Sequence, residues 1–185
     1  MFRCVIEDNS YTAIQVNGYV NLTVNNSHIS GSYYGISVSS SEIGEEIPIP
    51  DDRAEMLNVS FVVDNTEIEM YGTNSYGVRC SGQTVDCHVT NSRLQAILCE
   101  NVHSCTVQRC TMNSTRSLYT PAVNAVRVQT LVIDSNIIAN KIFGQAVRAS
   151  RCNSVQASFI FFFPAEYVHD NFVSHRLHWL IILNC

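Results

Sequence analysis

The feature that most constrains this chain is a pattern of apolar residues that returns along most of its length. Two apolar residues alternate with a variable one, a short polar stretch follows, and a third apolar residue closes the motif. The clearest copies are Leu22–Ile29, Phe61–Ile68 and Cys87–Leu94, and weaker copies begin at residues 4, 105, 131 and 155. A sequence period of this kind is typical of repeat architectures, in which each unit packs only on its neighbours.

A second motif follows the first one in nearly every repeat. It consists of a small residue, an apolar residue, a variable residue and another apolar residue. Its copies begin at Ala13, Gly35, Gly77, Ala96, Ala125 and Ala146. Successive first motifs start 18 to 39 residues apart, and the longest step contains an insertion at residues 40–56.

Alternation with a period of two predicts strands that bury one face. Val (21 residues) and Ile (16 residues) outnumber Leu (9 residues), which also favours strands. Two short strands in every repeat, joined by polar turns, predict one coil of a parallel β-solenoid. Neighbouring coils would lie about 4.8 Å apart, so six or seven coils would form a rod about 30 Å long. The expected fold class is therefore all-β.

The combined pattern resembles the repeats of right-handed parallel β-helix proteins, the pectate-lyase-like superfamily. The shared elements are apolar-x-apolar-x-Asn-(Ser/Thr)-x-(Ile/Leu), then Gly/Ala-apolar-x-apolar, and the resemblance covers roughly residues 4–160. It implies a right-handed, single-stranded β-helix with one strand-turn-strand path through all the coils. Asn26, Asn65 and Asn91 fall in register at the turn and resemble that family's asparagine ladder, in which side-chain amides bond along the stack. The alternative is that asparagine is simply favoured in turns.

We expect a β-helix domain over residues 1–160 and a separate tail over residues 161–185. The insertion holds six acidic residues and one basic residue between positions 41 and 55, which favours a solvated loop over a calcium site. The tail is expected to be irregular or helical, with residues 168–183 as an amphipathic helix that caps the open end. At the other end Met1 leads almost directly into a coil. We therefore expect a fragment of a longer chain, or an open N-terminal end that contacts neighbouring coils or another copy.

Charge and hydropathy exclude some partners. The net charge of −5 argues against a nucleic-acid-binding surface. The longest apolar runs, residues 159–163 and 179–183, are too short to cross a bilayer, so no membrane insertion is expected. The residues leave the compartment open, and the family resemblance implies an extracellular or cell-surface location.

Three arginines are the candidate substrate-binding residues. Arg79, Arg127 and Arg148 occupy the variable position of the second motif, so they are predicted on one lateral face, where they could bind carboxylate or sulfate groups of a polysaccharide. The alternative is that solvated arginines pair with nearby acids. Lyases of the resembled family use a basic residue on such a face with calcium held by carboxylates, and Asp64 and Asp86, with Asp134, are possible partners.

The hydrolases of the resembled family are matched less well. Their Asn-Thr-Asp motif has only the near match Asn65-Thr66-Glu67, and the single Asp-Asp pair, Asp51-Asp52, lies in the insertion. Tyrosines gather in or near the turns and could stack on sugars or pack against the turns; these are Tyr33, Tyr34, Tyr71, Tyr76 and Tyr119.

Cysteines fall in register at two inward positions. Cys87 and Cys105 share the position in the first motif, and Cys80 and Cys99 share the one in the second. Stacked thiols are expected there, with disulfides between adjacent coils as the alternative. No metal site is predicted, because inward positions on successive coils cannot surround an ion tetrahedrally.

Three functions remain open at this stage. The first is a non-catalytic β-helix repeat domain that contacts carbohydrate or serves as a surface module. The second is a calcium-dependent polysaccharide lyase or related carbohydrate-active enzyme that acts on an acidic polysaccharide, and the third is a structural spacer or adhesin segment. No cofactor is expected, apart from calcium in the lyase case. Whether the chain is an enzyme, and which residues would be catalytic, is left undecided.

Overall fold

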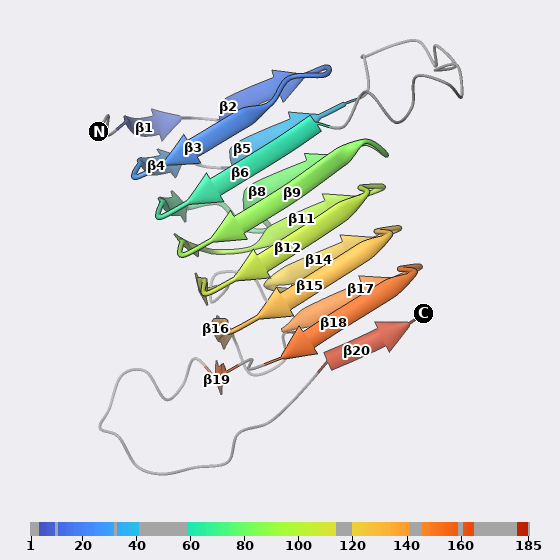
Figure 1. The fold of residues 1–185 in the computed structure, drawn as a ribbon. Helices are drawn as coiled ribbons and strands as arrows, with labels where there is room; N and C mark the ends of the chain where they lie inside the picture. Colours follow the sequence, from blue (N-terminus) through green and yellow to red (C-terminus); the bar gives the residue numbers. More distant parts are fainter. Residues whose placement is uncertain are drawn as a thin grey trace.

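The computed structural model describes residues 4–9, 11–31, 33–40, 59–113, 120–140, 146–158, 161–164 and 181–184. These residues form twenty strands, and none of them lies in a helix. All strand pairs are parallel, and the strands stack into three sheets (Figure 1). The protein is therefore an all-β parallel β-helix, as expected.

Each sheet takes every third strand of the chain. Sheet A consists of β1 (Val5–Asn9), β4 (His28–Gly31), β7 (Glu67–Met70), β10 (Arg93–Leu94), β13 (Thr111–Asn113), β16 (Ile137–Asn140) and β19 (Phe161–Pro164). Sheet B consists of β2 (Thr12–Asn17), β5 (Tyr34–Ser39), β8 (Tyr76–Ser81), β11 (Ile97–Glu100), β14 (Val123–Val126), β17 (Val147–Ser150) and β20 (Ile181–Asn184). Sheet C consists of β3 (Leu22–Asn25), β6 (Val59–Asp64), β9 (Val85–Thr90), β12 (Ser104–Gln108), β15 (Thr130–Asp134) and β18 (Ser154–Ser158).

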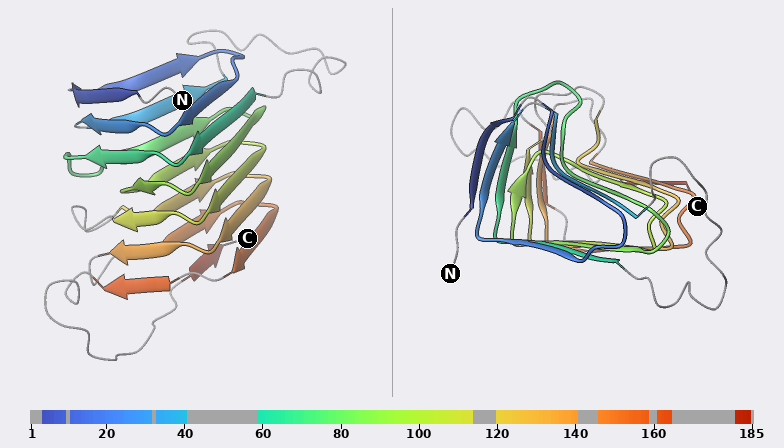
Figure 2. Two further views of the ribbon diagram at one scale, coloured as in Figure 1. Left: turned by 60° about the vertical axis from the view of Figure 1, so that its left-hand side comes forward. Right: turned by 90° about the horizontal axis from the view of Figure 1, so that it is seen from above.

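A coil therefore contains three strands, in the order A, B, C, and the expectation of two is wrong. The first motif spans a corner of the coil: Leu22 and Val24 lie in β3, and Ile29 lies in β4 of the next sheet. The polar residues between them form the corner. The sequence pattern gave no sign that this motif is divided between two strands. The twenty strands make up six complete coils and two further strands. The coils superimpose when viewed along the stack (Figure 2).

The interior is filled by apolar side chains that repeat in register. In sheet C, Leu22 pairs with Phe61 and Phe61 with Cys87, while Val63 pairs with Val89 on the same inward face. Phe61 and Val63 are fully buried. Burying one such side chain contributes about 1.5–3 kcal/mol, and each coil supplies several, so stability comes from the stack as a whole.

Small residues occupy the corner between sheets A and B, as the second motif requires. A Cβ atom at Gly35 would collide with the Ile68 side chain and lie 2.6 Å from the carbonyl oxygen of Gly77. The corresponding position in the fifth coil is Ala122, since Val123 pairs with Ile97 and with Val147. The second motif of that coil begins at residue 122, and not at Ala125 as expected.

Asparagines form the corner between sheets C and A. Asn26, Asn65 and Asn91 all adopt the left-handed conformation, with φ of 50°, 45° and 51°, which asparagine tolerates better than most residues. Asn65 Nδ2 donates to Asn26 Oδ1 at 2.6 Å, so the predicted ladder exists there. Asn91 departs from it, because its Nδ2 donates to Asp64 Oδ1 at 2.7 Å.

Two strands lie within the segment that was expected to be an irregular or helical tail. β19 pairs with β16, and β20 pairs with β17. The expected helix over residues 168–183 is therefore wrong for residues 181–183, because these apolar residues extend sheet B. Residues 165–180, and residues 41–58, which include all but the first residue of the acidic insertion, lie outside the described part of the chain.

Candidate functional site

Four tyrosines lie together at the corner between sheets A and B. Tyr11 and Tyr33 precede strands β2 and β5, while Tyr34 and Tyr76 are the first residues of β5 and β8. The rings of Tyr11 and Tyr33 stack with centroids 5.5 Å apart, and Tyr34 and Tyr76 stack at 6.4 Å. Tyr34 meets Tyr11 and Tyr33 edge-on at 6.0 and 4.7 Å. We refer to these four residues, together with Arg79, as the tyrosine face.

The sequence pattern contained a signal for this cluster. Tyr11 and Tyr33 each stand two residues before a small residue of the second motif, and Tyr34 and Tyr76 each stand one residue before it. Aligning the copies on the small residue places these rings on neighbouring coils, because Tyr34 pairs with Tyr76 in sheet B. Tyr11 is the member that the sequence analysis missed.

Arg79 joins the tyrosines from the outward face of β8. Its guanidinium carbon lies 5.4 Å from the centroid of the Tyr34 ring, within the range of a cation–π contact. The same guanidinium contacts Glu100 at 3.5 Å. Burial raises the pKa of Tyr34, and the positive charge of Arg79 acts in the opposite direction. The Tyr34 hydroxyl is therefore neutral near pH 7 and can donate as well as accept a hydrogen bond.

The other two candidate arginines are separated from Arg79. Arg148 shares its outward row, but the row passes through Leu98 and Asn124 before it reaches Arg148. Arg127 is not in the row at all, which corrects the sequence prediction. It lies after β14, in a corner with φ of 55°, and its backbone N–H donates to the Ser150 carbonyl. The physical reason is that the strand of this coil runs from Val123 to Val126.

Two polar atoms of the outward row are shielded from solvent without a hydrogen-bond partner in the described part of the protein. They are Nε of Arg79 and Oδ1 of Asn124, which lie two strands apart on sheet B. An unpaired buried polar atom costs free energy that a suitable ligand group can recover.

The three candidate carboxylates lie on a different sheet from the arginine row. Asp64, Asp86 and Asp134 belong to strands β6, β9 and β15 of sheet C. Each accepts a hydrogen bond from a hydroxyl of the next coil: Thr90 to Asp64 at 2.7 Å, Ser104 to Asp86 at 2.6 Å and Ser158 to Asp134 at 2.6 Å. They are thus bonded along their own sheet, and the lyase arrangement of an arginine beside these carboxylates is not formed.

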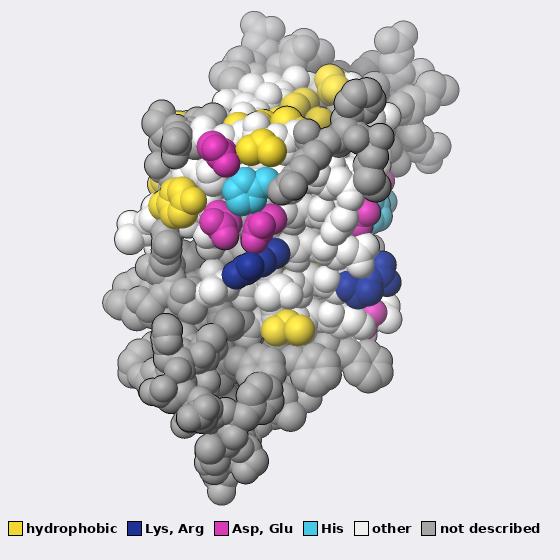
Figure 3. Space-filling view, turned by 90° about the vertical axis from the view of Figure 1, so that its left-hand side faces the viewer, with side chains coloured by type: hydrophobic (Ala, Val, Ile, Leu, Met, Phe, Trp, Pro, Cys, Tyr) yellow, Lys and Arg dark blue, Asp and Glu magenta, His cyan; other side chains and the backbone are white. Residues whose placement is uncertain are grey.

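A charged row crosses the outer face of sheet A. His28 Nδ1 lies 3.4 Å from Glu67 Oε2, and an Arg93 guanidinium nitrogen lies 3.2 Å from Glu67 Oε1. Figure 3 shows acidic, histidine and basic side chains gathered on this side of the molecule. An open depression of about 480 Å³ lies beside the row, lined also by Asn26, Asn65 and Asn91. The sequence analysis did not single out this row, although all three residues fill the variable position before the last apolar residue of the first motif.

The cysteines occupy the inward positions that the sequence predicted. Cys87 pairs with Cys105 in sheet C, and Cys80 pairs with Cys99 in sheet B. The structure adds that the two stacks face each other, with Sγ of Cys80, Cys87 and Cys99 all within 4.8 Å of one another. The sequence argument against a metal site considered each stack by itself, so it does not hold for this arrangement.

Comparison with protein-family models, with curated proteins and with solved structures finds no match to this chain. Among the described residues, no helix is long and apolar enough to cross a membrane.

Proposed function

We propose that this chain is a β-helix module that binds carbohydrate through the tyrosine face. The observation that carries the proposal is the four-ring cluster, which extends over three neighbouring coils beside a guanidinium group. The wider pectate-lyase-like relationship and an extracellular or surface location fit this role and belong to the same proposal.

The exposed rings supply the apolar part of such a site. Tyr11 is 63% exposed and Tyr33 is 37% exposed, so parts of these rings reach solvent. Aromatic rings carry a negative face, which attracts the weakly positive C–H groups of a sugar ring, and their hydroxyls can bond to sugar hydroxyls. An aromatic surface with polar groups at its rim is the combination that a sugar needs.

Arg79 supplies the charged part and points to an acidic sugar. The guanidinium offers several N–H donors in a planar fork that matches a carboxylate or a sulfate. Its present partner, Glu100, is only partly buried, so exchange for a ligand carboxylate would cost little. We therefore favour uronate-containing or sulfated polysaccharides over neutral ones.

Binding without catalysis is the better supported form of this proposal. The carboxylates suggested for the lyase alternative lie on sheet C, whereas the tyrosine face lies at sheet B. Proton abstraction beside a uronate needs the base and the metal ligands around one sugar. If no glycan binds, we would conclude that the role of the chain is purely structural.

The test is titration calorimetry with acidic oligosaccharides and their neutral counterparts, at low and high salt. Tyr33→Ala should weaken binding on the order of tenfold through the lost ring contact. Arg79→Gln should remove the preference for acidic sugars and the salt dependence. Arg148→Gln is the matched control, because it removes an arginine from the same row outside the cluster, and it should leave affinity unchanged.

Two outcomes would overturn the proposal. If the folded protein binds no member of the panel, the structural reading replaces it. If product sizing with calcium, and with a chelator as control, shows calcium-dependent cleavage of a uronate polymer, the lyase reading replaces it.

A further inference from the structure

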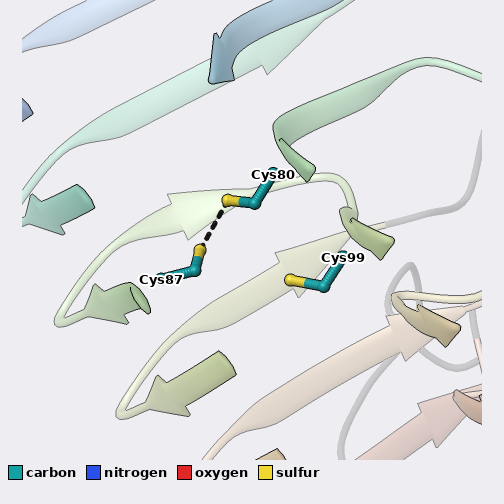
Figure 4. A group of neighbouring side chains, drawn as sticks. All are labelled: Cys80, Cys87 and Cys99. Atoms are coloured by element: carbon teal, nitrogen blue, oxygen red, sulfur yellow. Dashed lines mark hydrogen bonds between the residues drawn. The ribbon is translucent and has the colours of Figure 1, made fainter. Parts of the chain in front are cut away.

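Four fully buried cysteines meet inside two neighbouring coils. Cys80 in β8 and Cys99 in β11 project from sheet B, while Cys87 in β9 and Cys105 in β12 project from sheet C. All four side chains have zero exposure. Figure 4 shows the first three, with the sulfur of Cys80 directed at that of Cys87.

Two short sulfur–sulfur contacts lie within a coil. Sγ of Cys80 lies 2.6 Å from Sγ of Cys87, and Sγ of Cys99 lies 2.7 Å from Sγ of Cys105. Non-bonded heavy atoms normally rest about 3.5–4.0 Å apart, and sulfur is larger than carbon. A covalent S–S bond of about 2.05 Å is closer to these distances than any non-bonded contact.

A tetrahedral metal site fits the same four atoms less well. With metal–sulfur bonds of about 2.3 Å, the sulfurs would lie about 3.8 Å apart, so each close pair would have to separate by more than an ångström. A zinc ion with four thiolates also carries two net negative charges, and these cysteines belong to a buried cluster of apolar side chains. Burying uncompensated charge there is costly, whereas a disulfide is neutral.

The protonation state of the buried thiols also favours a disulfide over a metal site. Burial raises the pKa of Cys80 well above its usual value, so the thiolate that a metal needs is disfavoured. The same burial keeps the folded protein's thiols away from soluble oxidants, since it is the exposed thiolate that reacts.

We propose that Cys80–Cys87 and Cys99–Cys105 form two disulfide bonds that join sheet B to sheet C across the interior. Each bond replaces two S–H bonds with one S–S bond. The two electrons and two protons pass to the disulfide of an oxidant such as oxidised glutathione, which leaves as two thiols. Because the folded cysteines are inaccessible, the bonds form during folding, before the two coils close. They then hold a corner of each coil in place.

The sequence offers a direct test by peptide mapping. The chain is refolded in a glutathione redox mixture, denatured with a chelator and a thiol-alkylating reagent, and digested with trypsin. Cleavage after Arg79, Arg93 and Arg109 puts each proposed pair into its own peptide, 80–93 and 94–109. We expect each peptide to be unalkylated and lighter by two hydrogen atoms than its reduced form. The remaining four of the eight cysteines should be alkylated.

The same map separates the alternatives. Bonds along the stacks, Cys80–Cys99 and Cys87–Cys105, would join the two peptides to each other and overturn the proposed pairing. Full alkylation of all eight cysteines would overturn the disulfides, and elemental analysis of the native protein would then show whether a metal ion occupies the cluster instead.

A variant pair tests the structural consequence. Thermal unfolding of the oxidised protein should shift to lower temperature when the chain is refolded with reductant. Replacing both Cys80 and Cys87 with alanine should reduce that shift, because one of the two bonds cannot form. The control replaces Cys110 and Cys152, which are buried cysteines outside the cluster, and should retain the full shift. An unchanged shift in the first variant would contradict the Cys80–Cys87 bond.

Discussion

Two corners of the β-helix solve the same backbone problem with different side chains. At the corner from sheet C to sheet A, the left-handed residues are Asn26, Asn65, Asn91, Arg109 and Ser135. At the corner from sheet B to sheet C, they are Gly18, Gly82, Asn101, Arg127 and Arg151. Both series turn the chain sharply at one residue per coil, and both bond their backbone N–H groups to carbonyls of the next coil.

The residue that follows the turn distinguishes the two corners. At the C–A corner it is buried and mostly polar: Ser27, Thr66, Ser92, Cys110 and Asn136. At the B–C corner the residue that follows is exposed in two coils, as Tyr19 and Gln83, and buried and apolar or weakly polar in three, as Val102, Val128 and Cys152.

Hydrogen bonding explains this difference. The backbone N–H of Thr66 donates to Ser92 Oγ at 3.1 Å, and that of Cys110 donates to Asn136 Oδ1 at 2.9 Å. The C–A corner therefore needs a side-chain acceptor from the next coil to satisfy a buried donor. A corner that needs particular side chains leaves a sequence motif, whereas one that needs only a backbone conformation leaves almost none.

The largest test of this comparison is Asn136→Ala. Asn136 is fully buried, accepts from the Cys110 N–H and donates to the Val107 carbonyl at 2.9 Å. Leaving these two backbone groups unpaired should lower the free energy of unfolding by about 3 kcal/mol. Val128→Ala, at the equivalent position of the other corner, removes only two methyl groups and should cost about 1.6 kcal/mol. Urea unfolding compares the two variants, and equal losses would refute the distinction between the corners.

A smaller effect is expected from glycine at the turn itself. Asn65→Gly keeps the left-handed backbone but removes the bond to Asn26, so stability should fall by about 1 kcal/mol. Arg127→Gly removes the steric cost of a non-glycine residue in the left-handed conformation, which stabilises the folded state. It also raises the conformational entropy of the unfolded chain, which opposes this gain, so the free energy of unfolding should change by no more than about 0.5 kcal/mol. If Arg127→Gly destabilises as much as Asn65→Gly, the Arg127 side chain has a structural role that the register does not indicate.

The smallest effect is a dependence on acid at the C–A corner. Hydrogen bonds from Thr90 and Asn91 hold the pKa of Asp64 below its ordinary range. Because the folded pKa is the lower one, the stabilisation is present above the unfolded value of about 3.9 and is lost as the pH falls through the folded pKa. Asp64→Asn should flatten the stability curve below about pH 4. Chemical unfolding at several pH values measures this, and an unaltered slope would count against these hydrogen bonds.

Much of the architecture could be predicted because it depends on local alternation. The inward pairs Cys87–Cys105 and Cys80–Cys99 and the bond between Asn26 and Asn65 follow from aligning equivalent residues. Aligning the repeats gave the wrong register where two overlapping segments of the sequence fitted the same motif. Ala122-Val123-Asn124-Ala125 and Ala125-Val126-Arg127-Val128 both fit the second motif, and only strand pairing selects the first. The candidate site inherited this error, since Arg127 was assigned to a strand that ends at Val126.

By itself, the sequence determined that the chain forms a parallel stack, which side chains point inward and which residues repeat from coil to coil. These properties depend on residues close together in the sequence, where they appear as an alternation with a period of two and as a recurring turn. The tertiary structure decided that a coil has three sides, that the tyrosines of three coils form one cluster with Arg79 over the Tyr34 ring, and that Cys80 faces Cys87. These depend on the angle at each corner, which is set by the packing of whole coils and leaves no period in the sequence.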